Sequence, residues 1–370
     1  PFTATAPVLQ LIQDNFHLSI TSVGWLNSLP LFAFALFSPV SATLARTFGL
    51  ERTLFGALLV ISAGIVLRSA GSVWALYVGT MLIGTGIALG NVLLPGLIKR
   101  DFAGKVASMT GAYSITMGAA GALGSAIIIP LAQHWGWNMA LALLVTAPVL
   151  ALILWFPQLN KHHQMTLSGS HQTATVAVWT SPLAWQVTLF MGLNAMPFYV
   201  AVGWLPAILT ENGISPAKAG AIHGMLQFTT AIPGLMLAAT LRRLKDQKMA
   251  AVVVSLLSGI SLIGMLYAPG QSMLWAAILG FGCGASMMLG LTFIGLRTKN
   301  AGDAAALSGM AQCVGYLMAA MGPLLLGKVH DGSGGWTVPL LLTAAVTVAG
   351  ACTGLAAGRN VYLESAASTR

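Results

Sequence analysis

The segment VWALYVGTMLIGTGIALGNVLLPGLI, residues 73–98, contains no charged side chain and is followed at once by Lys99, Arg100 and Asp101. A helix that crosses a lipid bilayer needs about 20 consecutive, mostly apolar residues, and this segment exceeds that length. Comparable segments occur along the whole chain, which predicts a protein that crosses the membrane many times. The predicted spans are 21–45, 53–71, 73–98, 105–132, 137–157, 183–209, 217–241, 249–268, 272–296, 303–328 and 336–358, and residues 1–12 form the end of another.

The composition excludes a soluble protein. Only 7% of the 370 residues are charged and 56% are hydrophobic, whereas about 25% of an average globular protein is charged. A soluble fold of this composition would expose large apolar patches to water. All eight carboxylates fall in loops or at helix ends, and the isolated histidines complete no catalytic or metal-binding constellation. We therefore expect no enzyme, no cofactor and no metal site.

The basic residues predict the orientation of the spans. Fourteen of the 17 Lys and Arg fall in gaps on one side of the predicted membrane, and only Arg68, Lys218 and Lys328 fall on the other. By the positive-inside rule the first side is cytoplasmic, which also places both termini in the cytoplasm. Because the net charge of +9 is spread over short gaps, we expect no nucleic-acid partner.

The chain contains a weak internal repeat. Gly84 corresponds to Gly280, Arg100 to Arg297 and Trp135 to Trp336, in the same direction along the chain. This pattern predicts two halves of six helices each, related by an axis along the membrane normal. The predicted parts are 1–157, a first half with its first helix incomplete; 158–182, a cytoplasmic linker; 183–358, the second half; and 359–370, a cytoplasmic tail. The fold class is an all-α membrane protein of 12 transmembrane helices.

Several motifs resemble a known family. The stretch SPVSATLARTFGLER at 38–52 resembles the signature loop of the major facilitator superfamily. Arg46 stands at the position that Asp usually occupies in that loop. The blocks GNVLLPGLIKRDF at 90–102, SPLAWQVTLF at 181–190, GLTFIGLR at 290–297 and ALSGMAQCVGY at 306–316 resemble its cyanate and 2-nitroimidazole transporter family.

The resemblance implies a monomeric secondary transporter in a bacterial inner membrane that works by alternating access. It implies a small-molecule substrate, with a 2-nitroimidazole favoured over cyanate and with protons as a candidate coupling ion for export. A multidrug efflux pump of the same superfamily is the alternative, and a passive channel is a more distant one. Membrane lipid is the remaining expected partner.

Polar residues inside the spans are the candidate substrate contacts, because such groups are costly in lipid unless they serve a purpose. His223 and Gln227 share one face of the span 217–241, and His223 is the candidate proton-coupling group because imidazole titrates near neutral pH. A neutral histidine bonded to a neighbouring helix is the alternative. Asn91 in the span 73–98 suits a small polar solute, with a helix-to-helix hydrogen bond as its alternative.

Aromatic and amide side chains complete the predicted substrate contacts, since aromatic faces suit a planar heterocycle. These are Tyr113, Asn194, Tyr199, Trp204, Gln312 and Tyr316. Trp204 is alternatively an anchor at the membrane interface, and Gln312 with Tyr316 alternatively packs against another helix.

A third group predicts gating. Arg100 and Arg297 occupy equivalent cytoplasmic helix ends, with Asp101 and Asp303 close in sequence, so we expect contacts between the halves in the outward-open state. Plain positive-inside residues are the alternative. Pro95 and Pro197 are expected to bend their helices during gate movement.

Overall fold

The computed structural model describes residues 2–102, 105–160, 178–234, 236, 246–298 and 301–363, and its regular structure over these residues is entirely helical. The first half consists of η1 Thr3–Val8, α1 Leu9–Phe16, α2 Ile20–Phe48, α3 Leu50–Arg68, α4 Val73–Asp101, α5 Val106–Ala142, η3 Leu143–Val145, α6 Thr146–Trp155 and η4 Phe156–Asn160. The second half consists of α8 Pro182–Glu211, α9 Pro216–Thr229, α11 Lys248–Tyr267, η5 Pro269–Gln271, α12 Ser272–Leu296, α13 Ala301–Ser333 and α14 Thr337–Ala357.

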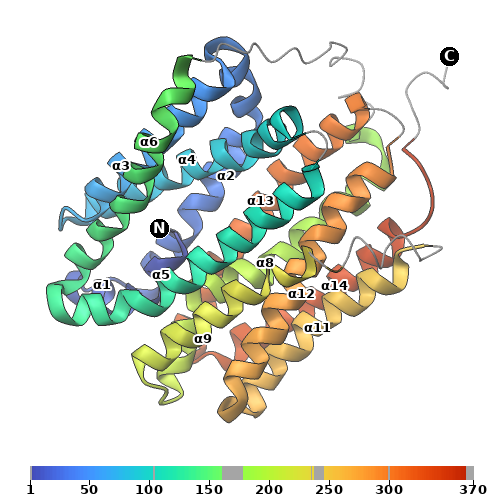
Figure 1. The fold of residues 1–370 in the computed structure, drawn as a ribbon. Coiled ribbons are helices and arrows are strands. Elements are labelled where there is room, and N and C mark those ends of the chain that lie inside the picture. The colour runs from blue at the N-terminus through green and yellow to red at the C-terminus, as the bar shows by residue number, and fades with distance from the viewer. Residues whose placement is uncertain are drawn as a thin grey trace.

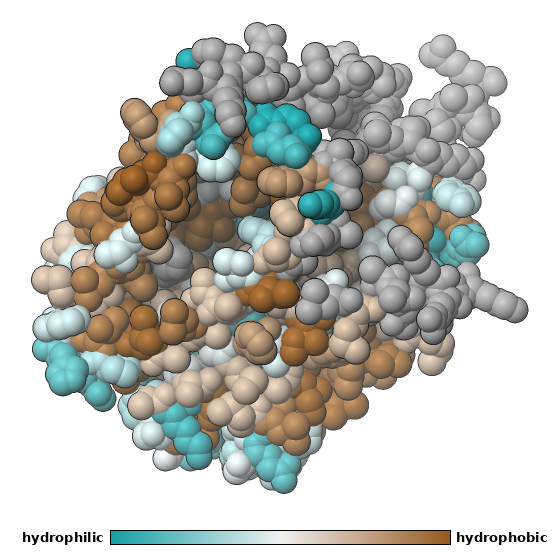
Figure 2. All heavy atoms as spheres, in the orientation of Figure 1, coloured by the Kyte–Doolittle hydropathy of each residue, from teal (hydrophilic) through white to brown (hydrophobic). Residues whose placement is uncertain are grey.

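Nine of the described helical segments are long and apolar enough to cross a membrane. Large apolar side chains stay exposed along them, including Leu154 at 69% and Trp74 at 68% exposed. Figure 2 shows this apolar surface along the helices, with hydrophilic residues gathered toward their ends. A surface of this kind is stable in lipid and not in water. The predicted membrane class is confirmed.

Local sequence explains where the helices begin and break. The side chains of Ser19 and Ser72 accept hydrogen bonds from the first turns of α2 and α4, which satisfies free backbone N–H groups. Gly49 has φ of 87° and joins α2 to α3 with no intervening loop. Gly136, with φ of 77°, interrupts α5, so the backbone turns there as the gap between the predicted spans 105–132 and 137–157 requires.

The helix ends define two sides of the bundle, a linker side and a distal side. The linker side carries the α2–α3 and α4–α5 turns and the ends of α6 and α8 that flank residues 161–177, which lie outside the described residues. The distal side carries the turns 17–19, 69–72, 212–215 and 334–336. In Figure 1 the two halves lie next to each other, the first half in blue to green and the second in yellow to red.

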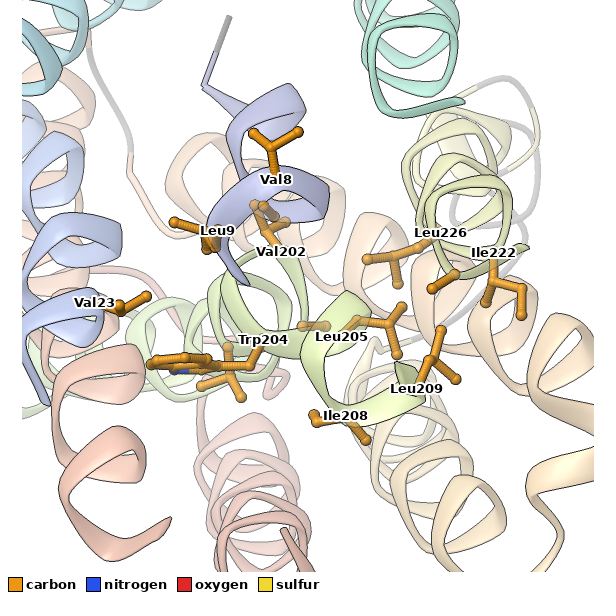
Figure 3. Packing of buried hydrophobic residues seen from close by; sticks show 14 of the residues in the cluster. Val8, Leu9, Val23, Val202, Trp204, Leu205, Ile208, Leu209, Ile222 and Leu226 are labelled. Carbon is orange, nitrogen blue, oxygen red and sulfur yellow. The ribbon is translucent and has the colours of Figure 1, made fainter. Parts of the chain in front are cut away.

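The halves meet along two helix pairs. Helix α2 packs along α13, and α5 packs along α9. An apolar cluster reinforces this contact on the distal side: Val8, Leu9 and Val23 of the first half pack with Val202 and Trp204 of α8 (Figure 3). Burial of these side chains holds the halves together at that side.

Two features add detail to the sequence prediction. The predicted span 217–241 corresponds to α9, which ends at Thr229, while residues 235 and 237–245 lie outside the described ones. Arg68, predicted on the outer side within the span 53–71, ends α3 on the distal side, and its side chain is only 1% exposed. Its Nη1 donates to Thr5 Oγ1 at 2.7 Å, because the helix end points the guanidinium into the first half.

Candidate functional site

Four of the predicted substrate contacts come together where the halves meet. We call Asn91, Tyr113, Tyr199 and Tyr316 the tyrosine site. Asn91 on α4 and Tyr113 on α5 belong to the first half, and the Tyr113 hydroxyl donates a hydrogen bond to Asn91 Oδ1 at 3.1 Å. Both side chains are half-buried. The α4–α5 turn brings the two helices together, so residues far apart in sequence become partners.

The second half contributes an aromatic cluster to the same place. The Tyr199 and Tyr316 ring centroids are 6.4 Å apart and nearly perpendicular. The Phe34 ring of the first half contacts the Tyr316 ring edge-on, with 5.3 Å between the ring centroids. The centroids of the Phe2 and Tyr199 rings are 6.3 Å apart. Edge-to-face contacts of this kind are favourable and orient the rings. The cluster therefore holds both tyrosines against the first half.

The two parts of the tyrosine site face each other. Tyr113 of the first half and Tyr316 of the second lie close enough for their hydroxyls to interact electrostatically. The hydroxyls of Tyr199 and Tyr316, both in the second half, also interact. Neither the Tyr199 nor the Tyr316 hydroxyl hydrogen bonds to another residue in the described part of the chain. Both side chains are half-buried, so these two hydroxyls are available to a solute.

Gln227 lies beside this region on α9. Its side chain is 5% exposed, and its amide nitrogen has no hydrogen-bond partner among the described atoms. A Cβ built on Gly121 would be 3.4 Å from Gln227 Cβ and 3.6 Å from Thr3 Oγ1, so α9 and η1 converge on this glycine of α5. An unpaired buried amide is costly and marks a place for a further partner.

His223 lies one helical turn from Gln227, toward the distal side, and is fully buried. Its Nδ1 is 3.0 Å from Ser125 Oγ on α5, so the pair joins the two halves. The backbone of Val202 faces the ring from α8. The other ring nitrogen, Nε2, has no hydrogen-bond partner among the described atoms. The structure thus places His223 in the contact between the halves and not on an open surface.

Three predicted contacts lie elsewhere. Trp204 is 2% exposed and donates from Nε1 to the Pro323 carbonyl at 2.9 Å, within the second half. Asn194 is buried and donates to the Phe190 carbonyl in its own helix, with Gly350 of α14 against it. Gln312 donates to Ser308 Oγ on its own helix. Trp204 therefore belongs to the apolar cluster where the halves meet, and Asn194 packs against α14.

The predicted gating residues are paired within their own halves on the linker side. Arg100 Nη1 is 2.8 Å from Glu51 Oε1, and Arg100 Nε is 2.6 Å from Asp101 Oδ1. The hydrogen bond that Arg100 donates to Asp101, with a smaller contribution from Glu51, raises the pKa of Arg100. This guanidinium therefore stays charged and ties the start of α3 to the end of α4.

Arg297 makes the equivalent connection in the second half without a charged hydrogen-bond acceptor. It donates from Nε to the Ala357 carbonyl at 2.9 Å and from Nη2 to Gln247 Oε1 at 2.6 Å. Burial lowers the pKa of Arg297. Asp303 is 6% exposed near the start of α13. Pro197 lies inside α8, which remains one helix, and the side chain of Pro95 lies outside the described residues.

All inter-half hydrogen bonds between described residues lie toward the distal side. They join Gln10 to Thr210, Thr21 to Asp331, Asn27 to Gly203, Ser28 to Ala320 and Ser125 to His223. The described contacts therefore close the bundle at its distal side.

Sequence analysis missed some of these residues. Ser125 lies in a stretch of small residues that indicates close helix packing and nothing more. Phe34 resembles any apolar residue of a span, and Asp331 any loop carboxylate. Their roles depend on a partner in the other half, and no spacing along the chain reveals that partner.

Comparisons with known proteins agree with the fold. A family model described as Major Facilitator Superfamily matches residues 1–323. The chain is 53% identical over 360 residues to the 2-nitroimidazole transporter of Escherichia coli K12, covering 97% of this chain and 92% of that protein. It is 26% identical to the cyanate transport protein CynX of the same organism, covering 90% and 87%.

A solved structure, that of a D-xylose–proton symporter, superimposes with a TM-score of 0.76 at 14% identity, covering 98% of this chain and 94% of the other. That likeness concerns the fold alone. Together with the family match and the paired helix bundles, it agrees with a membrane transporter of small solutes. The chain belongs to the major facilitator superfamily.

Proposed function

We propose that this protein carries a small planar heterocycle of the 2-nitroimidazole type across a bacterial inner membrane by alternating access. The observation that supports this most directly is the tyrosine site. It draws Asn91 and Tyr113 from one half and Tyr199 and Tyr316 from the other, and two of its hydroxyls have no described protein partner. Flat aromatic surfaces and hydroxyl groups suit a planar polar ring. The likeness to a 2-nitroimidazole transporter points to the same solute class.

Alternating access requires the halves to rock about the site that they share. The contacts between described residues close the distal side, and we assign access in this conformation to the linker side. Basic residues on the linker side, Arg52, Arg100 and Lys105 among them, support a cytoplasmic location for it under the positive-inside rule. In the opposite conformation the distal hydrogen bonds separate and the solute leaves outward.

His223 is the candidate group for coupling export to protons. In the conformation described here its ring is enclosed between Ser125 and the Val202 backbone. It meets the outer aqueous phase only when α5 and α9 separate at the distal side. Proton exchange at His223 would therefore be linked to the change of conformation, as coupling requires.

Counterflow in proteoliposomes tests the function. The full-length protein is expected to accumulate labelled 2-nitroimidazole when unlabelled 2-nitroimidazole is present on the other side, and a passive channel shows no such stimulation. Tyr199→Ala and Tyr316→Ala should reduce the flux at least about tenfold, because each removes aromatic contact and a hydroxyl. Val253→Ala, on an exposed face of α11, is the control. A preference for cyanate, or stimulation only by bulky lipophilic cations, would contradict the proposed substrate.

A second measurement tests the coupling. His223→Gln keeps a polar side chain but cannot take up a proton. Counterflow, which needs no pH gradient, should persist in this variant. Uptake driven by a pH gradient should fall to the level measured without a pH gradient. Gradient-driven flux equal to that of the unchanged protein would exclude His223 as the coupling group.

A further inference from the structure

The bond between Tyr113 and Asn91 bears on which solutes the site accepts, given the proposed function. An asparagine amide presents a carbonyl oxygen on one side and two N–H donors on the other. The Tyr113 hydroxyl donates to Asn91 Oδ1 at 3.1 Å, so the oxygen end of the amide is already engaged. The remaining free groups of Asn91 are its two N–H donors. The tyrosine fixes the asparagine in its donor orientation.

Among the described residues, no carboxylate hydrogen bonds to Asn91 or Tyr113. The eight carboxylates of the chain lie in loops or at helix ends, away from the middle of the spans. The Tyr316 hydroxyl, which can donate, lies near Tyr113 of the pair, and the Tyr199 ring packs against Tyr316 with 6.4 Å between the ring centroids. The buried Gln227 amide nitrogen, another donor, has no described partner. Donors of α4 and α13 therefore lie at the pair, Tyr199 of α8 lies next to Tyr316, and the Gln227 amide lies further along α5 beside Gly121.

From this geometry we infer that the tyrosine site selects planar rings that carry a hydrogen-bond acceptor group, and that Tyr113 sets this selectivity by orienting Asn91. The acceptor group has two coplanar oxygens, as in a nitro group or a carboxylate, because such a group can take hydrogen bonds from several donors at once. An amino group at the same position places N–H against N–H and leaves buried donors unpaired. Tyr113 is a positioning residue that acts through Asn91.

Binding of three matched rings tests the inference: 2-nitrothiazole, thiazole-2-carboxylate and 2-aminothiazole. They share one planar ring and differ in the substituent, and the first two separate a neutral from an anionic acceptor. The unchanged full-length protein should bind an acceptor-bearing ring about tenfold or more tighter than the amino ring, the size of effect that an unpaired buried donor brings. Calorimetry on protein in lipid nanodiscs gives each Kd.

Tyr113→Phe removes only the hydroxyl that orients Asn91, so the amide can turn and present its oxygen. The ratio of the amino Kd to the nitro Kd should fall to within about threefold of unity, because either substituent then finds a partner. Asn91→Asp, which offers oxygens alone, should favour the amino ring. Tyr77→Phe is the matched control, since it removes a hydroxyl that donates to the Ser22 carbonyl of the same half at 2.7 Å. That control should keep the original ratio.

The outcomes separate the two proposals. If the unchanged protein binds none of the three rings, this inference fails, and the proposed function fails with it only if counterflow of 2-nitroimidazole is also absent. If it binds all three equally, or if Tyr113→Phe weakens all three by the same factor, the inference alone fails. If Tyr113→Phe does not fold, the reversed preference of Asn91→Asp decides the matter, and an unchanged preference there overturns the inference.

Discussion

The hydrogen bond between Ser125 and His223 lies inside the membrane-spanning region, where water cannot replace a lost partner. Ser125→Ala should destabilise the distal contact by about 1–3 kcal/mol, the cost of leaving a buried polar group unsatisfied. The expected result is a lower melting temperature in nanodiscs and faster labelling of a cysteine placed at the buried position Ile129, one turn further along α5.

The control for this substitution is Ser255→Ala. The Ser255 hydroxyl is also buried, but it donates to the Ala251 carbonyl of its own helix at 2.8 Å. Removing it takes away a hydroxyl without touching the contact between the halves, so labelling should not change. Equal labelling of both variants would show that Ser125 does not hold α5 against α9.

The residues of the tyrosine site could be predicted from sequence, because polar or aromatic side chains in a charge-poor span attract attention. Asn91, Tyr113, Tyr199 and Tyr316 were all predicted. The same reasoning placed Trp204 in the site, although it bonds to Pro323 within the second half. A span reveals how deep a residue lies, whereas its direction depends on the rotation of the helix against its neighbours. That rotation is a property of the packed structure.

Glycines on α9 let this helix approach α5 closely. A Cβ added to Gly220 would lie 2.9 Å from the Ser125 carbonyl, and one added to Gly224 would lie 3.0 Å from the Ala122 carbonyl. Backbone atoms cannot move aside as flexible side chains do. Gly224→Ala should therefore separate α5 from α9 and disfavour the conformation that is closed at the distal side.

Accessibility of a distal cysteine to a membrane-impermeant maleimide measures this effect. Gly224→Ala should increase labelling, and Gly56→Ala should leave it unchanged, because a Cβ at Gly56 on α3 meets no atom within 4 Å. Gly56→Ala should even stabilise its helix slightly, by about 1 kcal/mol. Unchanged labelling of Gly224→Ala would mean that the helices accommodate the methyl group without separating.

Arg100 joins α3 and α4 on the linker side through two carboxylates that differ in burial. Substitutions on the two sides of this ion pair should therefore differ in their effect on stability. The Glu51 side chain is 5% exposed, whereas that of Asp101 is 43% exposed. Arg100→Gln leaves the Glu51 carboxylate buried without its cation, which is strongly unfavourable. Glu51→Gln leaves Arg100 paired with Asp101. The melting temperature should therefore fall more for Arg100→Gln than for Glu51→Gln, and the reverse order would contradict the importance of this ion pair.

The helices themselves followed from hydropathy because a bilayer demands long apolar segments with internally satisfied backbones. Predicted span 73–98 corresponds to α4 Val73–Asp101, and 272–296 to α12 Ser272–Leu296. Helix ends that continue beyond the apolar segment were harder to predict: α13 extends to Ser333, beyond the predicted end at 328. Past the apolar segment, polar helical turns and loops have similar composition, so the boundary carries little signal.

At the scale of the whole molecule, the contacts on the distal side decide which conformation is populated. Thr21 begins α2 in the first half and Asp331 lies near the end of α13 in the second. Asp331 Oδ2 accepts hydrogen bonds from the Thr21 backbone N–H at 3.1 Å and from Thr21 Oγ1 at 2.6 Å. A carboxylate near a helix N-terminus is favourable, so this contact stabilises the closed distal side. It has to break whenever that side opens.

Asp331→Asn tests this contact because it removes the charge and keeps the shape. A hydrogen bond to a neutral acceptor is weaker than one to a carboxylate, by about 1 kcal/mol at an exposed position, which shifts a two-state population about fivefold. Spin labels can be placed at Ala70 and Met273, exposed distal positions on the two halves. Double electron–electron resonance should then show a larger fraction of long distances between the two labels. Asp14→Asn is the control, since it neutralises another exposed distal carboxylate near the end of α1. If both variants gave the distance distribution of the unchanged protein, the other distal hydrogen bonds and the apolar cluster around Trp204 would hold that side closed without the Thr21–Asp331 contact.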